Sequence, residues 1–292
     1  MAEAVVERVG EEIQSPEAER LPLGQKLAFG MGGASNALIG NAVMGLAMPI
    51  YSIALGVSPA LVGIALSIPR FWDAISDPLM GNISDNTRTR WGRRRPWIAL
   101  GAILSGFFFF LLWIPPTSLS HTGLFIYFVI AALLYYTAYT IFIVPYNGLA
   151  YELSMDYNER IRVMAYLSFF GAVAVFATPW AYKLTFIFAR GTFRDQAVDI
   201  PILGPIFGVI FQVFGFDNLT GEDAHPEIVG VRVVGLLFGL LMIGTGIIPA
   251  IFCRENMRAQ EQDKINLVPA IKYTCTNRPF LLLCTMLFLI MV

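Results

Sequence analysis

Residues 27–69, LAFGMGGASNALIGNAVMGLAMPIYSIALGVSPALVGIALSIP, form a run that contains no Asp, Glu, Lys or Arg. About 20 apolar residues are enough to cross the ~30 Å hydrocarbon core of a bilayer, so this run is long enough for two crossings. Ser58 and Pro59 divide it, because Ser is a favoured N-cap and Pro is favoured in the first helical turn. We therefore expect membrane helices at about 27–55 and 59–84.

Further uncharged runs cover much of the remaining chain, at residues 96–151, 163–182, 233–253 and 279–292. Pro115 and Pro116 divide the first of them, which predicts helices near 97–114, 122–148, 160–188 and 230–252. Only 14% of the residues are charged and 56% are hydrophobic, whereas soluble domains are about 25% charged and about 45–50% apolar. This composition excludes a soluble enzyme, a nucleic-acid-binding protein and a disordered chain. It predicts an all-α transmembrane protein with a six-helix bundle over 27–252.

The segments around these helices have their own expected roles. Residues 1–26 are acidic and lack an apolar signal region, so we expect a disordered cytosolic tail. A long outer loop is expected at about 189–229 and a cytosolic central loop at 253–279. The 13 apolar residues 280–292 give only ~20 Å of helix, which predicts the start of a truncated seventh helix. Asp156 and Glu159 have the spacing of a capping box for the helix near 160.

The placement of Lys and Arg predicts the orientation, because cytoplasmic loops of membrane proteins are enriched in both. The loops after 59–84 and after 230–252 are basic, whereas those after 27–55 and 97–114 hold no Lys or Arg. We expect an integral protein of the cell (inner or plasma) membrane with a cytoplasmic N-terminus. The cysteines predict no disulfide, and His121 and His225 lack ligand partners, so no transition-metal site is expected.

Three charged residues lie inside the expected helix at 59–84. Arg70, Asp73 and Asp77 are spaced i, i+3, i+7, so they share one helix face. Each charge in the hydrocarbon costs at least ~2.5–3.5 kcal/mol, so such residues usually face a cavity or a partner. A structural Arg70–Asp73 ion pair is one interpretation. However, one Arg leaves one carboxylate over, which favours a bound cation or proton.

The residues around this pair suit a small hard cation. Two carboxylates one turn apart, with hydroxyl oxygens beside them, can bind Na⁺, or one carboxylate can hold a proton. Ser76 is adjacent to Asp77, and Thr140 of the helix at 122–148 supplies another oxygen unless it is an ordinary packing threonine. We expect Na⁺ or H⁺ as the coupling ion and no other cofactor.

The end of the same helix carries a motif. Gly81-x-x-x-Asp85 and the arginines that follow it are similar to the loop between helices 2 and 3 of major facilitator transporters. The string from Arg70 to Gly81, and then Arg88-x-Arg90-Trp91-Gly92-Arg93-x-Arg95-Pro96-Trp97, resembles the glycoside–pentoside–hexuronide:cation symporters, the family of the melibiose carrier. The resemblance continues through Tyr139-Thr140 to Glu152 and Glu159-Arg160. It implies the N-terminal half of a twelve-helix fold.

The resemblance also implies a function and a set of residues. The function is cation-coupled symport of a sugar, glycoside or related solute by alternating access. Cation binding falls on Asp73, Asp77, Ser76 and Thr140, with Arg70 as their charge partner. The cytoplasmic gate comprises Gly81, Asp85, Arg88, Arg90, Gly92, Arg93 and Arg95. The family's charged sugar clamp matches Ala37 (or Asn36), Ile143 and Ser168, so a galactoside is disfavoured and another neutral glycoside or an amphiphile stays open.

Polar residues elsewhere complete the set of candidates. Those that could line a solute cavity are Asn36, Asn41, Tyr139, Tyr146 and Asn147, although core packing is an alternative for each tyrosine. The expected partners are a small-molecule solute, the coupling cation, membrane lipid and a missing C-terminal six-helix half, with no nucleic acid. Without that half the site would lack its facing wall, so we expect no transport by residues 1–292 alone.

Two other classes of function compete with a symporter. A membrane-embedded Mg²⁺-dependent phospholipid or alcohol transferase could use Asp73, Asp77 and Asp85. The depth of the first two carboxylates and the absence of an Asp-Gly-x-x-Ala-Arg motif weigh against it. A non-transporting sensor built on a carrier fold is the second, and retention of both carboxylates weighs against it.

Overall fold

The computed structural model describes residues 21–116, 118–154, 156–189 and 226–255, together with residues 276, 277, 279, 282 and 286. The long elements in this part of the chain are all helices: α2 (Leu23–Ala47) with its π-helical continuation η2 (Met48–Ala54), α3 (Pro59–Asn86), α4 (Arg95–Leu112), α5 (His121–Leu153), α6 (Tyr157–Ala189) and α9 (Pro226–Phe252). Five of them, α2 with η2, α4, α5, α6 and α9, are long and apolar enough to cross a membrane. The 28-residue helix α3 is not one of these five, and it carries the charged residues Arg70, Asp73 and Asp77.

The six expected helices are all present, with differences at their ends. α2 begins at Leu23, so the expected tail at 1–26 is too long by four residues. α9 begins at Pro226 rather than near 230, which shortens the expected outer loop. Residues 190–225, 256–275 and most of 280–292 lie outside the described residues. The predictions of a long outer loop, a central loop and a seventh helix therefore stay predictions.

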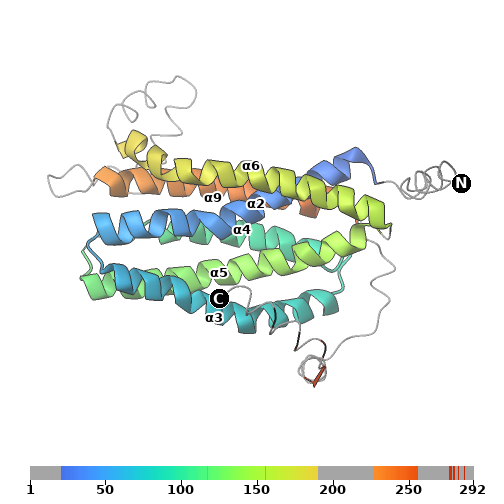
Figure 1. The fold of residues 1–292 in the computed structure, drawn as a ribbon, viewed down its shortest axis with the longest axis horizontal. Coiled ribbons are helices and arrows are strands. Elements are labelled where there is room, and N and C mark those ends of the chain that lie inside the picture. The colour runs from blue at the N-terminus through green and yellow to red at the C-terminus, as the bar shows by residue number, and fades with distance from the viewer. Residues whose placement is uncertain are drawn as a thin grey trace, which may run out of the picture.

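The helices lie roughly lengthwise beside one another in an up-and-down bundle (Figure 1). α6 and α9 occupy one side of the view, α3 occupies the opposite side, and α2, α4 and α5 lie between them. α2 packs on α6 and α9, α4 packs on α5 and α9, and α3 packs mainly on α5. α3 is therefore an edge helix, and Phe71 on it is 77% exposed.

Two features hold the interior together. At the crossing of α4 and α9 the backbones touch, since a Cβ on Gly239 would lie 2.6 Å from the carbonyl oxygen of Gly106. Three buried tyrosines donate hydrogen bonds to carbonyls of neighbouring helices: Tyr51 to Leu112 O at 2.6 Å, Tyr135 to Ile39 O at 2.7 Å and Tyr146 to Phe29 O at 2.6 Å. Each hydroxyl thus avoids the cost of an unpaired buried donor.

The start of α6 is tied to the start of α2. Asp156 Oδ2 accepts the N–H of Glu159 at 2.8 Å, which confirms the N-cap half of the expected capping box. The reciprocal half is absent, because the fully buried Glu159 side chain binds elsewhere. It pairs with Lys26 at 2.7 Å and Arg162 at 2.6 Å, and accepts the N–H of Leu21 at 3.2 Å.

Candidate cation site and charge cluster

A chain of hydrogen bonds joins α3 to α5 at the candidate cation site. Thr140 Oγ1 donates to Asp77 Oδ1 at 2.9 Å, and the hydroxyls of Thr140 and Ser76 lie 3.3 Å apart. Because the single proton of Thr140 goes to Asp77, Ser76 is the donor in the second bond. Ser76 and Thr140 are buried between the helices. The structure therefore brings three of the four expected cation-binding residues into one hydrogen-bonded group.

Asp73 lies one turn before Asp77 on α3 and is half-buried. Its Oδ1 atom is buried and has no hydrogen-bond partner among the described residues. A buried carboxylate oxygen without a donor is costly, and a cation or a proton relieves that cost.

Arg70 does not neutralise this pair. Among the described residues, the ion pairs within 4.0 Å do not include Arg70 with Asp73 or Asp77. Its guanidinium lies over the ring of Tyr136 instead, 5.4 Å from the centroid, in a cation–π contact. Arg70 and Asp73 therefore form no ion pair within 4.0 Å, and Arg70 acts on Asp73 as a charge partner only at longer range. Both carboxylates remain available to a cation.

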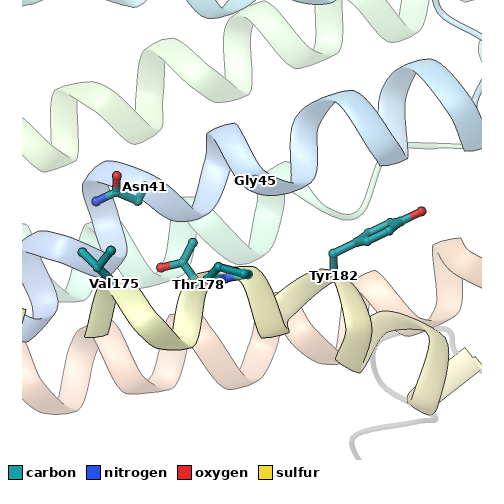
Figure 2. A pocket seen from close by; sticks show the side chains of 6 residues that line it. Asn41, Gly45, Val175, Thr178 and Tyr182 are labelled. Carbon is teal, nitrogen blue, oxygen red and sulfur yellow. The ribbon is translucent and has the colours of Figure 1, made fainter. Parts of the chain in front are cut away.

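The candidates for solute binding separate into different environments. Tyr139 donates to Asn36 Oδ1 at 2.8 Å and links α5 to α2. Asn147 is exposed on α5, and Asn41 is exposed beside a pocket between α2 and α6 (Figure 2). Tyr146 is fully buried with its hydroxyl bonded to the α2 backbone. We correct its assignment from cavity lining to core packing, because no face of its ring is open to a solute.

The cytoplasmic-gate candidates surround the turn between α3 and α4. Asp85 pairs with Arg94 at 2.8 Å, and Arg94 also lies 3.3 Å from Glu152 of α5. Glu152 pairs with Arg93 as well. Of the other gate candidates, Gly81 faces Val144 of α5, and Arg90 stacks on Trp91 at 5.7 Å. Glu152 belongs to the motif but was not predicted to act here.

A second acidic residue, Glu255, was not predicted at all. Its carboxylate accepts the backbone N–H groups of Arg93, Arg94 and Arg95 at 2.7, 2.7 and 2.8 Å, and so caps the N-terminus of α4. In return, the Arg95 side chain donates to Ala250 O at 2.6 Å and Ile251 O at 2.8 Å, and so caps the C-terminus of α9. We call this reciprocal capping by Glu255 and Arg95 the α4–α9 clasp.

One local signal marks the clasp in the sequence. Gly92, just before the three arginines, has a φ of +110°, a conformation that favours glycine. A Cβ at this position would also lie 2.5 Å from the Glu255 carboxylate. Two constraints therefore favour glycine at position 92: the positive φ of the turn and the close approach of the Glu255 carboxylate. Only the turn can be inferred from the sequence.

Similarity to known proteins agrees with this arrangement. The family described as MFS/sugar transport protein matches residues 28–291. An uncharacterised symporter of Synechocystis sp. is 37% identical over 158 residues, covering 52% of this chain and 29% of that protein. The sodium-dependent lysophosphatidylcholine symporter 1 of Gallus gallus is 35% identical over 251 residues, covering 83% of this chain and 45% of that protein. A putative glycoside/cation symporter of Escherichia coli, YagG, is 31% identical over 158 residues, covering 54% and 34%.

The chain spans about a third to a half of the length of these relatives. All three are named as symporters, which removes the transferase alternative. Because the family match covers nearly the whole sequence, the chain belongs to the MFS/sugar transport family of the major facilitator superfamily, a family of melibiose-carrier-like transporters and not of enzymes.

Proposed function

We propose that this chain supplies the first six helices of a twelve-helix symporter, in which a Na⁺ or H⁺ gradient drives the movement of a sugar, glycoside or related solute. The observation that carries the proposal is the uncompensated pair Asp73 and Asp77 on α3, with the hydroxyl of Thr140 beside it on α5. The names of the relatives support it, since one is a glycoside/cation symporter and another a sodium-dependent symporter. We further propose a cytoplasmic N-terminus in the cell membrane.

Cation binding at this pair changes the charge of an exposed face. With no cation, Thr140 donates its proton to Asp77 and Asp73 Oδ1 is left without a partner. A bound cation takes oxygens from both carboxylates, and rotation of the Thr140 and Ser76 hydroxyls presents their lone pairs to it. Neutralising the surplus charge lowers the cost of enclosing α3 against an opposing half. Cation binding thereby favours the occluded state, and the two halves rock about the solute.

The cytoplasmic cluster has a different proposed role. The side chains of Arg93, Arg94 and Arg95 all bind within this half, whereas Asp85 is 39% exposed despite its pair with Arg94. We propose that Asp85 is the gate residue that faces the opposing half. Arg93, Arg94 and Arg95 hold α3, α4, α5 and α9 together behind it.

Uptake by a reconstituted transporter tests the cation site. Vesicles would contain the chain together with a C-terminal six-helix half, and labelled glycosides and lysophosphatidylcholine would be offered with and without imposed Na⁺ and proton gradients. Asp77→Asn should abolish gradient-driven uptake and leave membrane insertion unchanged. Glu227→Gln, in the first turn of α9, is the matched carboxylate control and should transport normally. Gradient-driven uptake in Asp77→Asn equal to that of the control would refute the proposal.

A further inference from the structure

Arg70 lies on α3 with two possible partners within reach. Asp73 follows it by three residues on the same helix face, a spacing that favours an ion pair. Tyr136 lies opposite on α5, with its ring centroid 5.4 Å from the Arg70 guanidinium. Arg70 is exposed, so burial does not impose either choice. Within the described part of the chain, the guanidinium contacts the ring and forms no ion pair with Asp73 within 4.0 Å.

The ring of Tyr136 is held in place by its neighbours on α5. It is 1% exposed and packs edge-on against the rings of Tyr135 and Tyr139, with centroids 5.4 and 6.5 Å away. Both neighbours are bonded to α2. Tyr135 donates to Ile39 O at 2.7 Å. Tyr139 donates to Asn36 Oδ1 at 2.8 Å. The Tyr136 ring is therefore a fixed platform rather than a mobile side chain that follows Arg70.

Hydrogen bonds on either side of this contact fix the register of α3 against α5. Trp72 Nε1 donates to Thr137 Oγ1 at 2.9 Å. Farther along both helices, Thr140 Oγ1 donates to Asp77 Oδ1 at 2.9 Å. Because these bonds hold the two helices together, Arg70 stays within reach of the ring.

A guanidinium paired with Asp73 would compete with a coupling cation. Both would neutralise the same carboxylate, and Arg70 is tethered only three residues away. The face of an aromatic ring opposes this pairing because it attracts the guanidinium, and the attraction is stronger where water is excluded. The ring contact therefore leaves the buried Oδ1 atom of Asp73 without a donor and open to a cation.

We propose that Tyr136 is a positioning residue that holds Arg70 away from Asp73 and thereby sets the affinity of the site for its coupling cation. The inference rests on the proposed function, because the cation is taken to bind Asp73 and Asp77. It adds a residue of α5 that acts through Arg70 and not as a cation ligand.

The apparent Na⁺ affinity of the 292-residue chain in lipid nanodiscs, measured from the Na⁺-induced rise in Tm, tests the proposal. Tyr136→Met keeps an apolar, adaptable side chain but removes the ring. It should weaken the apparent affinity about tenfold, as expected if the competing Arg70–Asp73 pair takes about nine-tenths of the molecules. Tyr136→Phe keeps the ring and should bind Na⁺ as the unmodified chain does.

Removing Arg70 distinguishes this role from a loss of packing. In an Arg70→Gln background, Tyr136→Met should have no effect on the apparent Na⁺ affinity, because the competing guanidinium is gone. Tyr151→Leu is the matched control, since it removes another ring of α5 from a cation–π contact, with Arg160 at 5.8 Å, and should leave the affinity unchanged. Weaker binding in Tyr136→Phe, or the same weakening by Tyr136→Met with and without Arg70, would overturn the proposal.

A double-mutant cycle in Na⁺-free buffer tests the same contact without a cation. The effects of Arg70→Gln and Asp73→Asn on Tm should add within about 1 °C in the unmodified chain. In Tyr136→Met the two should show a coupling of roughly 2–4 °C. If Tyr136→Met does not fold, the unmodified chain decides: additive effects support the proposal, and a coupling of that size overturns it.

The outcome is separable from that of the cation-site test. Coupling that appears only in Tyr136→Met, with no Na⁺-induced rise in Tm in any variant, supports the positioning of Arg70 and rejects Na⁺ as the coupling cation. Na⁺ binding that is lost in Asp77→Asn but is equal in Tyr136→Met and the unmodified chain rejects the positioning role alone.

Discussion

Replacing Glu255 by alanine should loosen the α4–α9 clasp. The carboxylate accepts three backbone N–H groups, at 2.7, 2.7 and 2.8 Å, at the start of α4. The first amides of a helix have no partner inside it, and the helix dipole makes this end positive. The substitution therefore removes three hydrogen bonds and a favourable negative charge, and it leaves the Arg95 side chain's bonds to Ala250 O and Ile251 O as the remaining half of the clasp.

The magnitude follows from these contacts. Loss of an N-cap side chain costs about 0.5–2 kcal/mol, and hydrogen bonds to a charged group are each worth about 1.5–3 kcal/mol. Glu255 is only half-buried, so water replaces part of what is lost. We expect a net destabilisation of about 2 kcal/mol, which for a domain of this size corresponds to a Tm lower by roughly 4–8 °C.

Cys253 reports the opening of this end of α9. It is fully buried two residues before Glu255, with Sγ 3.7 Å from Gln25 O. Burial raises the pKa of its thiol to about 12, against about 8.5 for a free thiol, so alkylation at pH 8 requires the region to open. In a chain with Cys275→Ser and Cys284→Ser, Glu255→Ala should be alkylated about thirtyfold faster, the equivalent of 2 kcal/mol.

Two further variants make the test specific. Glu255→Gln keeps one acceptor oxygen and should fall between the unmodified chain and Glu255→Ala. Glu227→Ala removes a glutamate at the opposite end of α9 and should be alkylated at the unmodified rate. If Glu255→Ala reacts no faster than Glu227→Ala, the capping role of Glu255 is wrong.

Three other changes test separate parts of the structure. The free energy of unfolding should fall above about pH 8.5 by about 1.4 kcal/mol per pH unit, because the folded chain keeps the Cys253 thiol protonated up to its pKa of about 12 while the unfolded chain releases that proton. The dependence of Tm on pH should therefore be flatter in Cys253→Ala. An unchanged curve in that variant would contradict this explanation. Gly148→Ala should lower Tm by several degrees, since a Cβ there would overlap the Arg94 guanidinium, and an unaltered Tm would show that Arg94 moves freely. Thr140→Val should weaken the apparent affinity for Na⁺ about tenfold, as measured from the Na⁺-induced rise in Tm, because it removes an oxygen beside Asp77. An unchanged dependence of Tm on Na⁺ concentration would place the cation elsewhere.

The helices could be predicted because their cause is local. A backbone in hydrocarbon must satisfy its own hydrogen bonds, so uncharged runs of sufficient length become helices, and Ser58-Pro59 marks a boundary. The common face of Asp73 and Asp77 is also local, because 3.6 residues per turn fixes which side chains lie on one side of a helix. The proximity of Ser76 to Thr140 joins two helices, so spacing within one helix could not predict it; Thr140 was a candidate from its sequence, and the family resemblance also implied it.

Tertiary packing decided which faces meet. Periodicity places Arg70 beside Asp73, yet the guanidinium lies over Tyr136, because α5 presents a ring within reach. Periodicity gives Tyr146 no preference between a cavity and the core, and its stacking on Phe29 of α2 and its hydrogen bond to Phe29 O place it in the core.

Composition and helical period are enough to predict the helices and the charged face of α3. Only the tertiary structure brought Glu255 to the start of α4, across about 160 residues, and opened a pocket between α2 and α6 beside Gly45. The physical reason is that helical period fixes a direction around one axis, whereas contacts between helices depend on the distance and rotation of several axes at once.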